Sequence, residues 1–366
     1  MAKQVYKEVQ RKLNLVGSGF PKTAVGLENA FLKKLYSPED AEVFVRMKER
    51  GQFMTAKEYA RANGVEEAWA EEKLYDMSTR GIIYRQVRDG VREYAHYPFA
   101  FGLMEFQSER DDKSWLPAAG AYAALSKFSK ELHNTMPFYR TIPMSRDMVV
   151  GSQVLPYDDL DALLDRHDRF QVAQCMCRNM KKSCNHPTET CIMTDDMADF
   201  YNENGWGHPI SRDEAKAILR EGEKDGRIIQ VGNTKNAENL CSCCGCGCAM
   251  MQLGKRVGST AGKYWTNYTL EYDKDACVGC GVCVDRCTFK CIKKDGDKVE
   301  TNHEACLGCG LCVSTCPTHA RVLKRKSDED IYVPPETLND AYQMWYDVRQ
   351  GNVSIPVGLG AGSLDA

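Results

Sequence analysis

Eight cysteines between positions 277 and 316 follow one spacing twice, and this repeat restricts the fold of the chain more than any other feature. Each run reads C-x2-C-x2-C-x3-C, and the eight residues are Cys277, Cys280, Cys283 and Cys287, followed by Cys306, Cys309, Cys312 and Cys316. Three thiolates so close in sequence can converge on one metal centre only if the chain turns sharply. Glycines within each run permit such a turn; they are Gly279, Gly281, Gly308 and Gly310. Each run is therefore expected to form a tight loop around metal.

This spacing is the one with which cysteine thiolates hold cubane 4Fe-4S clusters, and the fourth cysteine of each run then ligates the cluster of the other run. Zinc is the alternative. Structural zinc sites usually combine two separated C-x2-4-C pairs, so three cysteines with only two residues between neighbours fit zinc poorly. The repeat therefore predicts two 4Fe-4S clusters.

The segments CVGCGVC, CLGCGLC and STCPTHA resemble the two-cluster bacterial ferredoxin domain. The resemblance extends over about residues 265–325. It implies that one cluster is held by Cys277, Cys280, Cys283 and Cys316, and that the other is held by Cys306, Cys309, Cys312 and Cys287. The resemblance also implies a ferredoxin-like fold, with strand, cluster loop and helix in each half of the repeat.

The chain departs from the ferredoxin pattern after the first run. Cys287 is followed by Thr288, whereas Cys316 is followed by the expected Pro317. This change predicts an altered loop beside the cluster that Cys287 would join. Cys291, four residues further on, could be a buried hydrophobic side chain or a substitute ligand, and we favour the buried thiol.

The chain has 18 cysteines in 366 residues, and their number bears on the compartment. Its first 20 residues contain no apolar core of signal-peptide length, so we expect the protein to stay in the cytoplasm, where thiols remain reduced and dense cysteine clusters indicate metal. Oxygen-labile clusters on this scale suggest an anaerobic cell. The formal net charge of −3 gives no general attraction to nucleic acid or to an anionic membrane, and no apolar run is long enough for membrane insertion.

Nine further cysteines lie upstream of the repeat: Cys175, Cys177, Cys184, Cys191, Cys241, Cys243, Cys244, Cys246 and Cys248. They are enough for one cluster with spare thiols or for two clusters. The pattern CMCR, CNHPTETC and CSCCGCGC is similar to a group of 4Fe-4S binding proteins of anaerobes, and this resemblance assigns no ligands. We favour iron–sulfur over zinc here, because a ferredoxin domain would use another relay cluster. A thiol-redox role for Cys243 and Cys246 is the alternative.

The N-terminal part of the chain shows a different pattern. Residues 38–106 predict three helices and then a hairpin that turns at Asp89-Gly90, an order that resembles a winged helix-turn-helix module. The third helix would have to enter the major groove of DNA, yet its acidic residues outnumber Lys73 and Arg80. DNA would repel such a helix. We therefore favour protein docking over DNA binding.

The predicted fold class is α+β multidomain. The predicted segments are an N-terminal lead (1–30), a winged-helix-like domain (31–110), bridging helices and strands (111–170), a small α+β Cys-rich domain (171–262), a ferredoxin-like dicluster domain (263–326) and a C-terminal tail (327–366). Within the bridge, we interpret the acidic residues from Asp158 to Asp165 as a solvated helix face rather than a cation site. The tail carries Tyr342, Trp345 and Tyr346, which could cover the chain's own domains or a partner.

Together these patterns predict an iron–sulfur protein that relays low-potential electrons through two 4Fe-4S clusters and a further upstream cluster, as a subunit or partner of an anaerobic oxidoreductase. No nucleophile and base pair stands out, so no catalytic residue is assigned. Two alternatives remain open. One is a redox-sensing winged-helix regulator, and the other is a catalytic subunit whose cluster has an open iron site.

Overall fold

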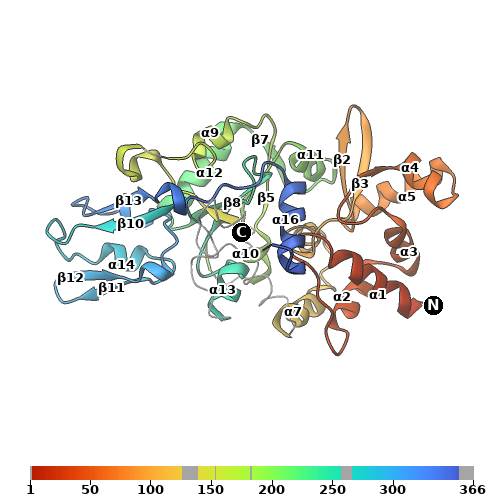
Figure 1. Cartoon of the computed structure of the whole chain (residues 1–366), viewed down its shortest axis with the longest axis horizontal. Coiled ribbons are helices and arrows are strands. Elements are labelled where there is room, and N and C mark those ends of the chain that lie inside the picture. Colours follow the sequence, from red (N-terminus) through yellow and green to blue (C-terminus); the bar gives the residue numbers. More distant parts are fainter. Residues whose placement is uncertain (1, 126–138, 153, 182–183, 257–265, 354–366) are drawn as a thin grey trace. The chain divides into compact units, whose positions relative to one another are not determined.

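The computed structural model describes residues 2–125, 139–152, 154–181, 184–256 and 266–353 (Figure 1). These residues divide into two compact units. Unit 1 consists of Met1–Thr135, Asp199–Trp206 and Asn339–Asn352, and unit 2 consists of Met136–Ala198, Gly207–Leu338 and Val353–Ala366. This division is coarser than the six predicted segments, whose boundaries stay a prediction. Among the described residues, no helix has both the length and the apolar character needed to cross a membrane.

Unit 1 is mainly helical and holds one small antiparallel sheet with the strand order β1-β3-β2. Its elements are α1 (Ala2–Leu13), α2 (Leu27–Leu35), α3 (Pro38–Arg46), β1 (Met54–Thr55), α4 (Ala56–Asn63), α5 (Glu67–Thr79), β2 (Tyr84–Arg88), β3 (Val91–Ala95), α6 (Met104–Ser108), α7 (Leu116–Leu125) and α16 (Leu338–Gln350). The three predicted helices are α3, α4 and α5. The predicted hairpin is confirmed, because Arg88 pairs with Val91 across Asp89-Gly90.

Local capping explains where two of these helices begin. The hydroxyl of Thr55 accepts a hydrogen bond from the Glu58 amide, and the Glu58 carboxylate accepts one from the Thr55 amide. This predicted capping box is confirmed. Ser37 and Asp40 make the same reciprocal pair at the start of α3.

Asp40 also joins α3 to α5. Its carboxylate is buried, accepts two hydrogen bonds of 2.8 and 2.9 Å from the Arg80 guanidinium, and lies 2.9 Å from the ammonium of Lys73. Burial acts to raise the pKa of Asp40, but hydrogen bonds from Arg80, Lys73 and Ser37 outweigh burial and hold the pKa well below its usual range.

The part of the tail from Asn339 to Asn352 packs within unit 1, whereas the residues before it belong to unit 2. Trp345 and Tyr342 are buried, and the Tyr342 ring lies 6.1 Å from the ring of Tyr97. The guanidinium of Arg50 lies over the Tyr346 ring at 4.3 Å. The aromatic residues of the tail therefore cover the chain's own fold. The glycine-rich end, residues 354–366, lies outside the described residues.

Unit 2 is built on a six-stranded antiparallel sheet with the strand order β4-β8-β9-β6-β5-β7. The strands are β4 (Tyr139–Thr141), β5 (Phe170–Gln174), β6 (Glu189–Thr194), β7 (His208–Ile210), β8 (Ile228–Gly232) and β9 (Asn239–Cys243). Its helices are α9 (Leu160–Leu164), α10 (Met176–Lys181), α12 (Arg212–Lys224) and α13 (Ala249–Arg256), and α11 (Asp195–Glu203) runs from unit 2 into unit 1.

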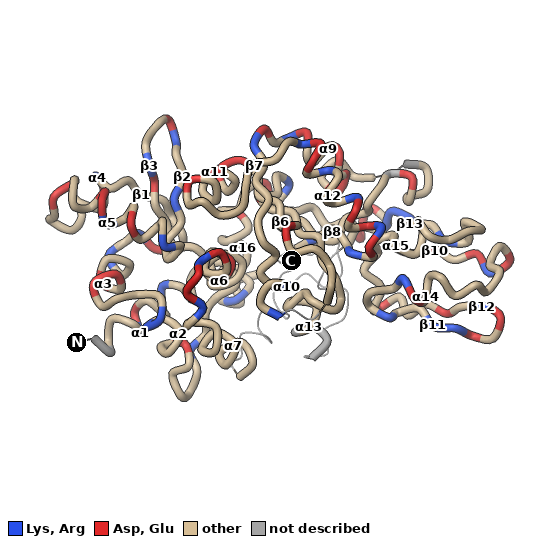
Figure 2. Tube along the Cα trace, turned by 180° about the vertical axis from the view of Figure 1, so that it is seen from behind, with Lys and Arg blue, Asp and Glu red and all other residues tan. Residues whose placement is uncertain are grey.

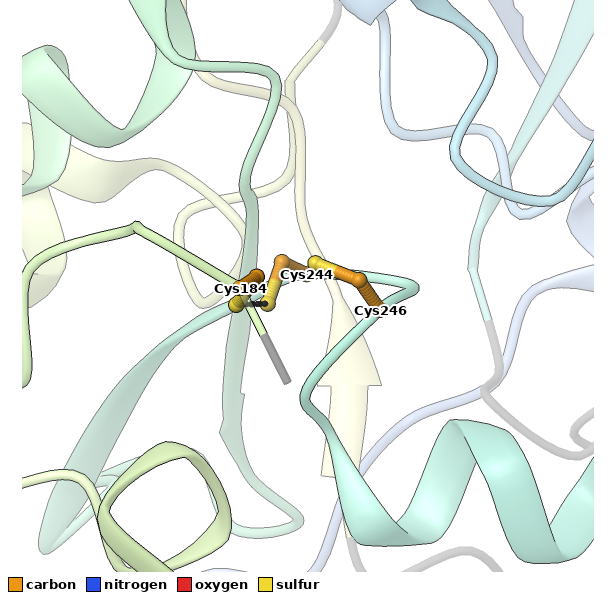
Figure 3. A group of neighbouring side chains, drawn as sticks. All are labelled: Cys184, Cys244 and Cys246. Atoms are coloured by element: carbon orange, nitrogen blue, oxygen red, sulfur yellow. Dashed lines mark hydrogen bonds between the residues drawn. The ribbon is translucent and has the colours of Figure 1, made fainter. Parts of the chain in front are cut away.

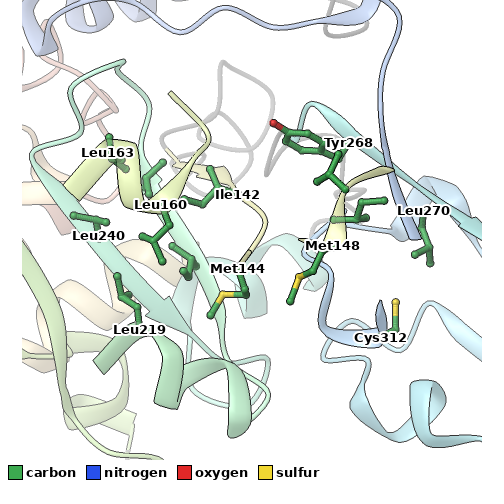
Figure 4. Close-up of a cluster of buried hydrophobic side chains, with 14 of the residues drawn as sticks. Ile142, Met144, Met148, Leu160, Leu163, Leu219, Leu240, Tyr268, Leu270 and Cys312 are labelled. Atoms are coloured by element: carbon green, nitrogen blue, oxygen red, sulfur yellow. The ribbon is translucent and has the colours of Figure 1, made fainter. Parts of the chain in front are cut away.

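Helix α12 begins at the predicted capping box of Ser211 and Glu214 and covers one face of this sheet. Its Leu219 packs in one apolar core with Leu240 of β9 and Ile192 of β6 (Figure 4). Because side chains alternate along a strand, the neighbours of these core residues point to the opposite face. Both Cys191 and Cys241 are such neighbours.

The acidic stretch from Asp158 to Asp165 follows the prediction only in part, since the side chains of Asp161 and Asp165 are exposed but two others are not. Asp158 and Asp159 are buried rather than solvated. Asp158 pairs with the guanidinium of Arg140 and accepts a 2.9 Å hydrogen bond from Asn267, while Asp159 caps α9. The charge pattern alone could not reveal the buried cation that makes this burial possible.

The C-terminal part of unit 2 contains two antiparallel strand pairs and two short helices. β10 (Tyr268–Tyr272) pairs with β13 (Arg321–Arg325), and β11 (Ile292–Asp295) pairs with β12 (Lys298–Thr301). The helices α14 (Val282–Arg286) and α15 (Leu311–Ser314) each follow a cysteine loop. Tyr268 and Leu270 of β10 belong to the same apolar core as α12 (Figure 4), so the Cys-rich and dicluster segments fold as one unit.

We expect Asp40→Asn to lower the free energy of unfolding of unit 1 by about 3 kcal/mol at pH 7, because it leaves Arg80 and Lys73 without their buried anion. A lowered folded-state pKa contributes stability above the unfolded pKa of about 3.9 and loses it as the pH falls. The difference should therefore shrink below about pH 3. Hydrogen exchange of peptides from α3 and α5 measures it. Glu39→Gln removes an adjacent exposed charge and should change stability by less than about 1 kcal/mol.

Candidate metal centres

The two cysteine loops need glycine at equivalent positions. Gly279 has a φ of +66°, and a Cβ there would lie 2.0 Å from the carbonyl oxygen of Asp297. Gly308 has a φ of +59°, and its Cβ would lie 2.7 Å from the carbonyl oxygen of Tyr268. Any side chain would clash with backbone at both sites. The sequence prediction that the loops turn sharply at these glycines is confirmed.

The first cavity lies between the first loop and the end of the second. Its lining includes Cys277, Cys280, Cys283 and Cys316. Three of these thiols come from one run and the fourth comes from the other. Cys280 is exposed, and Val278 beside it is 67% exposed, so this cavity lies close to the surface.

The lining of the second cavity includes Cys306, Cys309, Cys312 and Cys287. Its remaining lining is mostly apolar and includes Leu307, Leu311 and Phe289. The two cavities thus collect cysteines in the crossed arrangement that the ferredoxin resemblance implies. Four converging thiols in each cavity fit the ligand set of a cubane cluster.

Cys291 adds a fifth thiol to the second cavity. Its side chain is buried, and its sulfur lies 3.3 Å from the sulfur of Cys287. The hydrogen bond from Cys291 lowers the pKa of the Cys287 thiol to about 6. Cys291 is therefore a buried thiol that also hydrogen-bonds Cys287, a predicted cluster ligand.

Thr288, which stands where the ferredoxin pattern has proline, contacts the Cys-rich segment. Its hydroxyl donates a 2.9 Å hydrogen bond to the carbonyl oxygen of Gly226, just after α12. Arg286 donates a hydrogen bond of 2.5 Å to the carbonyl oxygen of Lys224, in the last turn of the same helix, where orphan carbonyls favour a cation. The departure from the ferredoxin pattern thus fastens the cluster loop to the Cys-rich segment.

Arg321 is a charged residue of this region that the sequence prediction missed. Its side chain is 2% exposed, donates a 3.2 Å hydrogen bond to the Thr301 hydroxyl, and lies over the Tyr272 ring at 4.8 Å. Burial raises the pKa of the Cys312 thiol to about 12, and the charge of Arg321 opposes this rise. The charge of Arg321 likewise opposes the rise that burial causes in the pKa of Cys283, a predicted ligand of the other cluster. A basic residue in a closing strand gives no sequence signal of such a position.

Strand pairing brings the upstream cysteines together. In the register of β6 and β9, Cys191 lies directly opposite Cys241, and Cys243 follows two residues later on the same face. Cys175 directly follows β5, and β5 pairs with β6. The pairing of β5, β6 and β9 therefore brings the segments that carry Cys175, Cys191 and Cys241 side by side.

Six of these thiols influence one another's pKa in a closed series, in which each thiol acts on two others. In order around the series they are Cys175, Cys177, Cys248, Cys243, Cys241 and Cys191, which acts in turn on Cys175. Hydrogen bonds from Cys177 and Cys191 lower the pKa of the Cys175 thiol. Cys175 and Cys248 are buried and the other four are partly buried. We call these residues the six-thiol ring.

The remaining three upstream cysteines are separate from the six-thiol ring. The sulfurs of Cys184, Cys244 and Cys246 all lie within 4.8 Å of one another (Figure 3), and those of Cys184 and Cys244 are 3.8 Å apart. Cys244 is buried, Cys184 is half-buried and Cys246 is exposed. We call these residues the three-thiol group. The sequence did not predict that the upstream cysteines form two groups, because Cys243 of one group and Cys244 of the other are adjacent in the chain.

One apolar cluster connects the six-thiol ring to the second cavity. Cys248 and Ile228 pack there with Leu307 and Leu311, and Cys243 and Cys309 lie at its edge. Cys309 is a predicted ligand of the second cluster, so the two thiol sets share a single low-dielectric environment.

Comparison with known proteins assigns part of the chain. A family model described as a 4Fe-4S dicluster domain matches residues 269–317. No curated protein and no solved structure matched the chain. The predicted dicluster region is thus confirmed, with two 4Fe-4S clusters and the electron-transfer role that such a domain implies.

Removal of the Arg321 charge should make the clusters harder to reduce, because a nearby cation stabilises the more negative reduced cluster. We expect Arg321→Gln to lower the reduction potential of at least one cluster by roughly 50 to 100 mV, measured by redox titration with EPR detection. Lys324→Gln removes an exposed charge from the same strand and should have a much smaller effect. Equal shifts in both variants would contradict a special role for Arg321.

Proposed function

We propose that this protein relays low-potential electrons through the two dicluster-domain clusters and a further iron–sulfur cluster at the six-thiol ring. It would work as a subunit or partner of an anaerobic oxidoreductase. The observation that carries this proposal is the apolar cluster that joins Cys243 and Cys248 of the ring to Cys309 of the second cavity. A cluster at the ring would thus have the second cluster as its neighbour.

The order of the relay follows from exposure. The six-thiol ring lies on the sheet face opposite the α12 core, and the second cavity has mostly apolar walls. The first cavity reaches the surface at Cys280, beside the exposed apolar side chains of Val278 and Val282. Exposed apolar groups beside a redox centre suit contact with another protein. Electrons would therefore pass between the ring and a partner by way of the second and then the first cluster.

The N-terminal elements support a docking role. The order α3, β1, α4, α5, β2, β3, with the hairpin strands side by side, is the order of a winged-helix module. Acidic residues recur along α5 (Figure 2), and most of their side chains are exposed. Lys73 and Arg80, in contrast, are paired with carboxylates. These two cations are not available for phosphate contacts, so a protein partner fits this helix better than DNA.

A redox-sensing regulator is the second candidate, and the winged-helix order of elements is the observation that favours it. A gel shift under anaerobic conditions at low salt separates the two functions. Electron transfer with protein docking predicts no sequence-specific binding. Specific binding that requires intact clusters would favour the regulator.

Protein purified without oxygen should contain at least about eight iron atoms per chain for the two cubanes, and more if the ring holds iron. Its visible absorption should bleach on chemical reduction. Cys243→Ser should remove the iron in excess of eight and leave the dicluster signals in place. A content of two iron atoms or fewer, with zinc in their place, would rule out the relay.

A further inference from the structure

The three-thiol group is a site in its own right rather than a part of the six-thiol ring. The three sulfurs of Cys184, Cys244 and Cys246 lie within 4.8 Å of one another, and the interactions that define the ring involve none of them. The sulfurs come from two segments of the chain, the loop after α10 and the loop between β9 and α13. Folding is therefore needed to assemble the group.

The spacing of the sulfurs fits a single metal ion. Two sulfurs bound to one tetrahedral zinc ion at about 2.3 Å lie about 3.8 Å apart. The sulfurs of Cys184 and Cys244 are 3.8 Å apart, and the third lies within 4.8 Å of both. A cubane would hold its cysteine sulfurs further apart, because each one binds a different iron. The geometry thus favours a mononuclear centre.

Buried cations surround this group. Arg178 is 3% exposed, donates 2.7 Å hydrogen bonds to the carbonyl oxygens of Pro187 and Ser242, and also hydrogen-bonds Cys244. Arg227 is 1% exposed and lies within electrostatic range of Cys244.

The charges of these two residues are incompletely matched. Arg227 pairs with Asp225 at 3.1 Å, but among the described residues its Nε and Nη1 have no hydrogen-bond partner. Three thiolates with one divalent cation carry a net charge of −1, which would offset part of this buried positive charge. The surroundings therefore suit an anionic metal–thiolate centre.

One side of the group is closed and the other is open. A Cβ on Gly247 would lie 3.1 Å from the sulfur of Cys244 and 3.4 Å from that of Cys184, so the loop backbone passes directly over these two atoms. Cys246 is exposed, so the group reaches solvent there. A metal held here would have three thiolate ligands and room for a fourth ligand from solution, the arrangement of zinc sites that react rather than only stabilise.

We infer that Cys184, Cys244 and Cys246 bind one thiophilic divalent cation of the zinc class, with the fourth coordination position open to a small ligand such as water or a soluble thiol. The centre is independent of the relay, because it shares no thiol with the six-thiol ring or with the two cavities.

The test compares adjacent cysteines in the full chain. Zinc and iron are measured together after anaerobic purification and dialysis against zinc. We expect about one zinc ion per wild-type chain. Cys184→Ser and Cys246→Ser should lose most of this zinc and keep the iron. Cys243→Ser, next to Cys244 but in the six-thiol ring, is the matched control and should lose iron and keep zinc.

A second measurement tests the open position. Co²⁺ replaces zinc in tetrahedral thiolate sites and gives ligand-field absorption in the visible range. Because the iron chromophore overlaps this range, the Co²⁺ signal is read as the difference between wild type and Cys246→Ser. Addition of a soluble thiol should shift the wild-type bands.

Two results would overturn the inference. One is a loss of about four iron atoms from Cys184→Ser or Cys246→Ser, since these residues would then be cubane ligands. The other is a zinc content that is the same in wild type and both variants. Neither result depends on whether the protein transfers electrons, so the relay can fail while this site stands, and the reverse.

Discussion

The antiparallel pairing of β6 with β9 is the constraint on which the upstream thiol sites depend. It places Cys191 opposite Cys241 and turns both thiols away from the α12 core. A shift of the register by one residue would exchange the two faces of a strand and bury these thiols among Ile192 and Leu240. The strand register that places the apolar residues in the core therefore also places the thiols on the opposite face.

Buried guanidinium groups make dense thiolate sites possible. Metal–thiolate centres carry negative charge, and an unpaired buried charge is costly. Arg321 supplies a positive charge between the two cavities, and Arg178 supplies one between the six-thiol ring and the three-thiol group. Each of these side chains is also fixed by hydrogen bonds to neighbouring groups, so its charge has a defined position. Their placement offers a means of adjusting cluster potentials without any change of ligand.

Local signals in the sequence were reliable wherever the interaction itself is local. The capping boxes at Thr55 and Ser211 and the turn at Asp89-Gly90 involve residues within three positions of one another, and all appear as predicted. The acidic stretch at Asp158 failed as a prediction, because its partner Arg140 lies 18 residues away and nothing near Asp158 reveals it. For the winged-helix prediction, local signals gave the order of the elements. They could not establish the fold of the module, which depends on long-range packing.

The sequence by itself determined the chemistry of the C-terminal half. A spacing of two residues between cysteines forces the thiols of one loop toward a common centre, and the glycines allow the turn. Only the tertiary structure decided how the nine upstream thiols divide. Cys243 and Cys244 are adjacent in the chain but belong to different sites: Cys243 is the last residue of β9, whereas Cys244 lies in the loop that follows and its sulfur is 3.8 Å from that of Cys184, 60 residues away. Long-range packing, rather than spacing, selects the partners of each thiol.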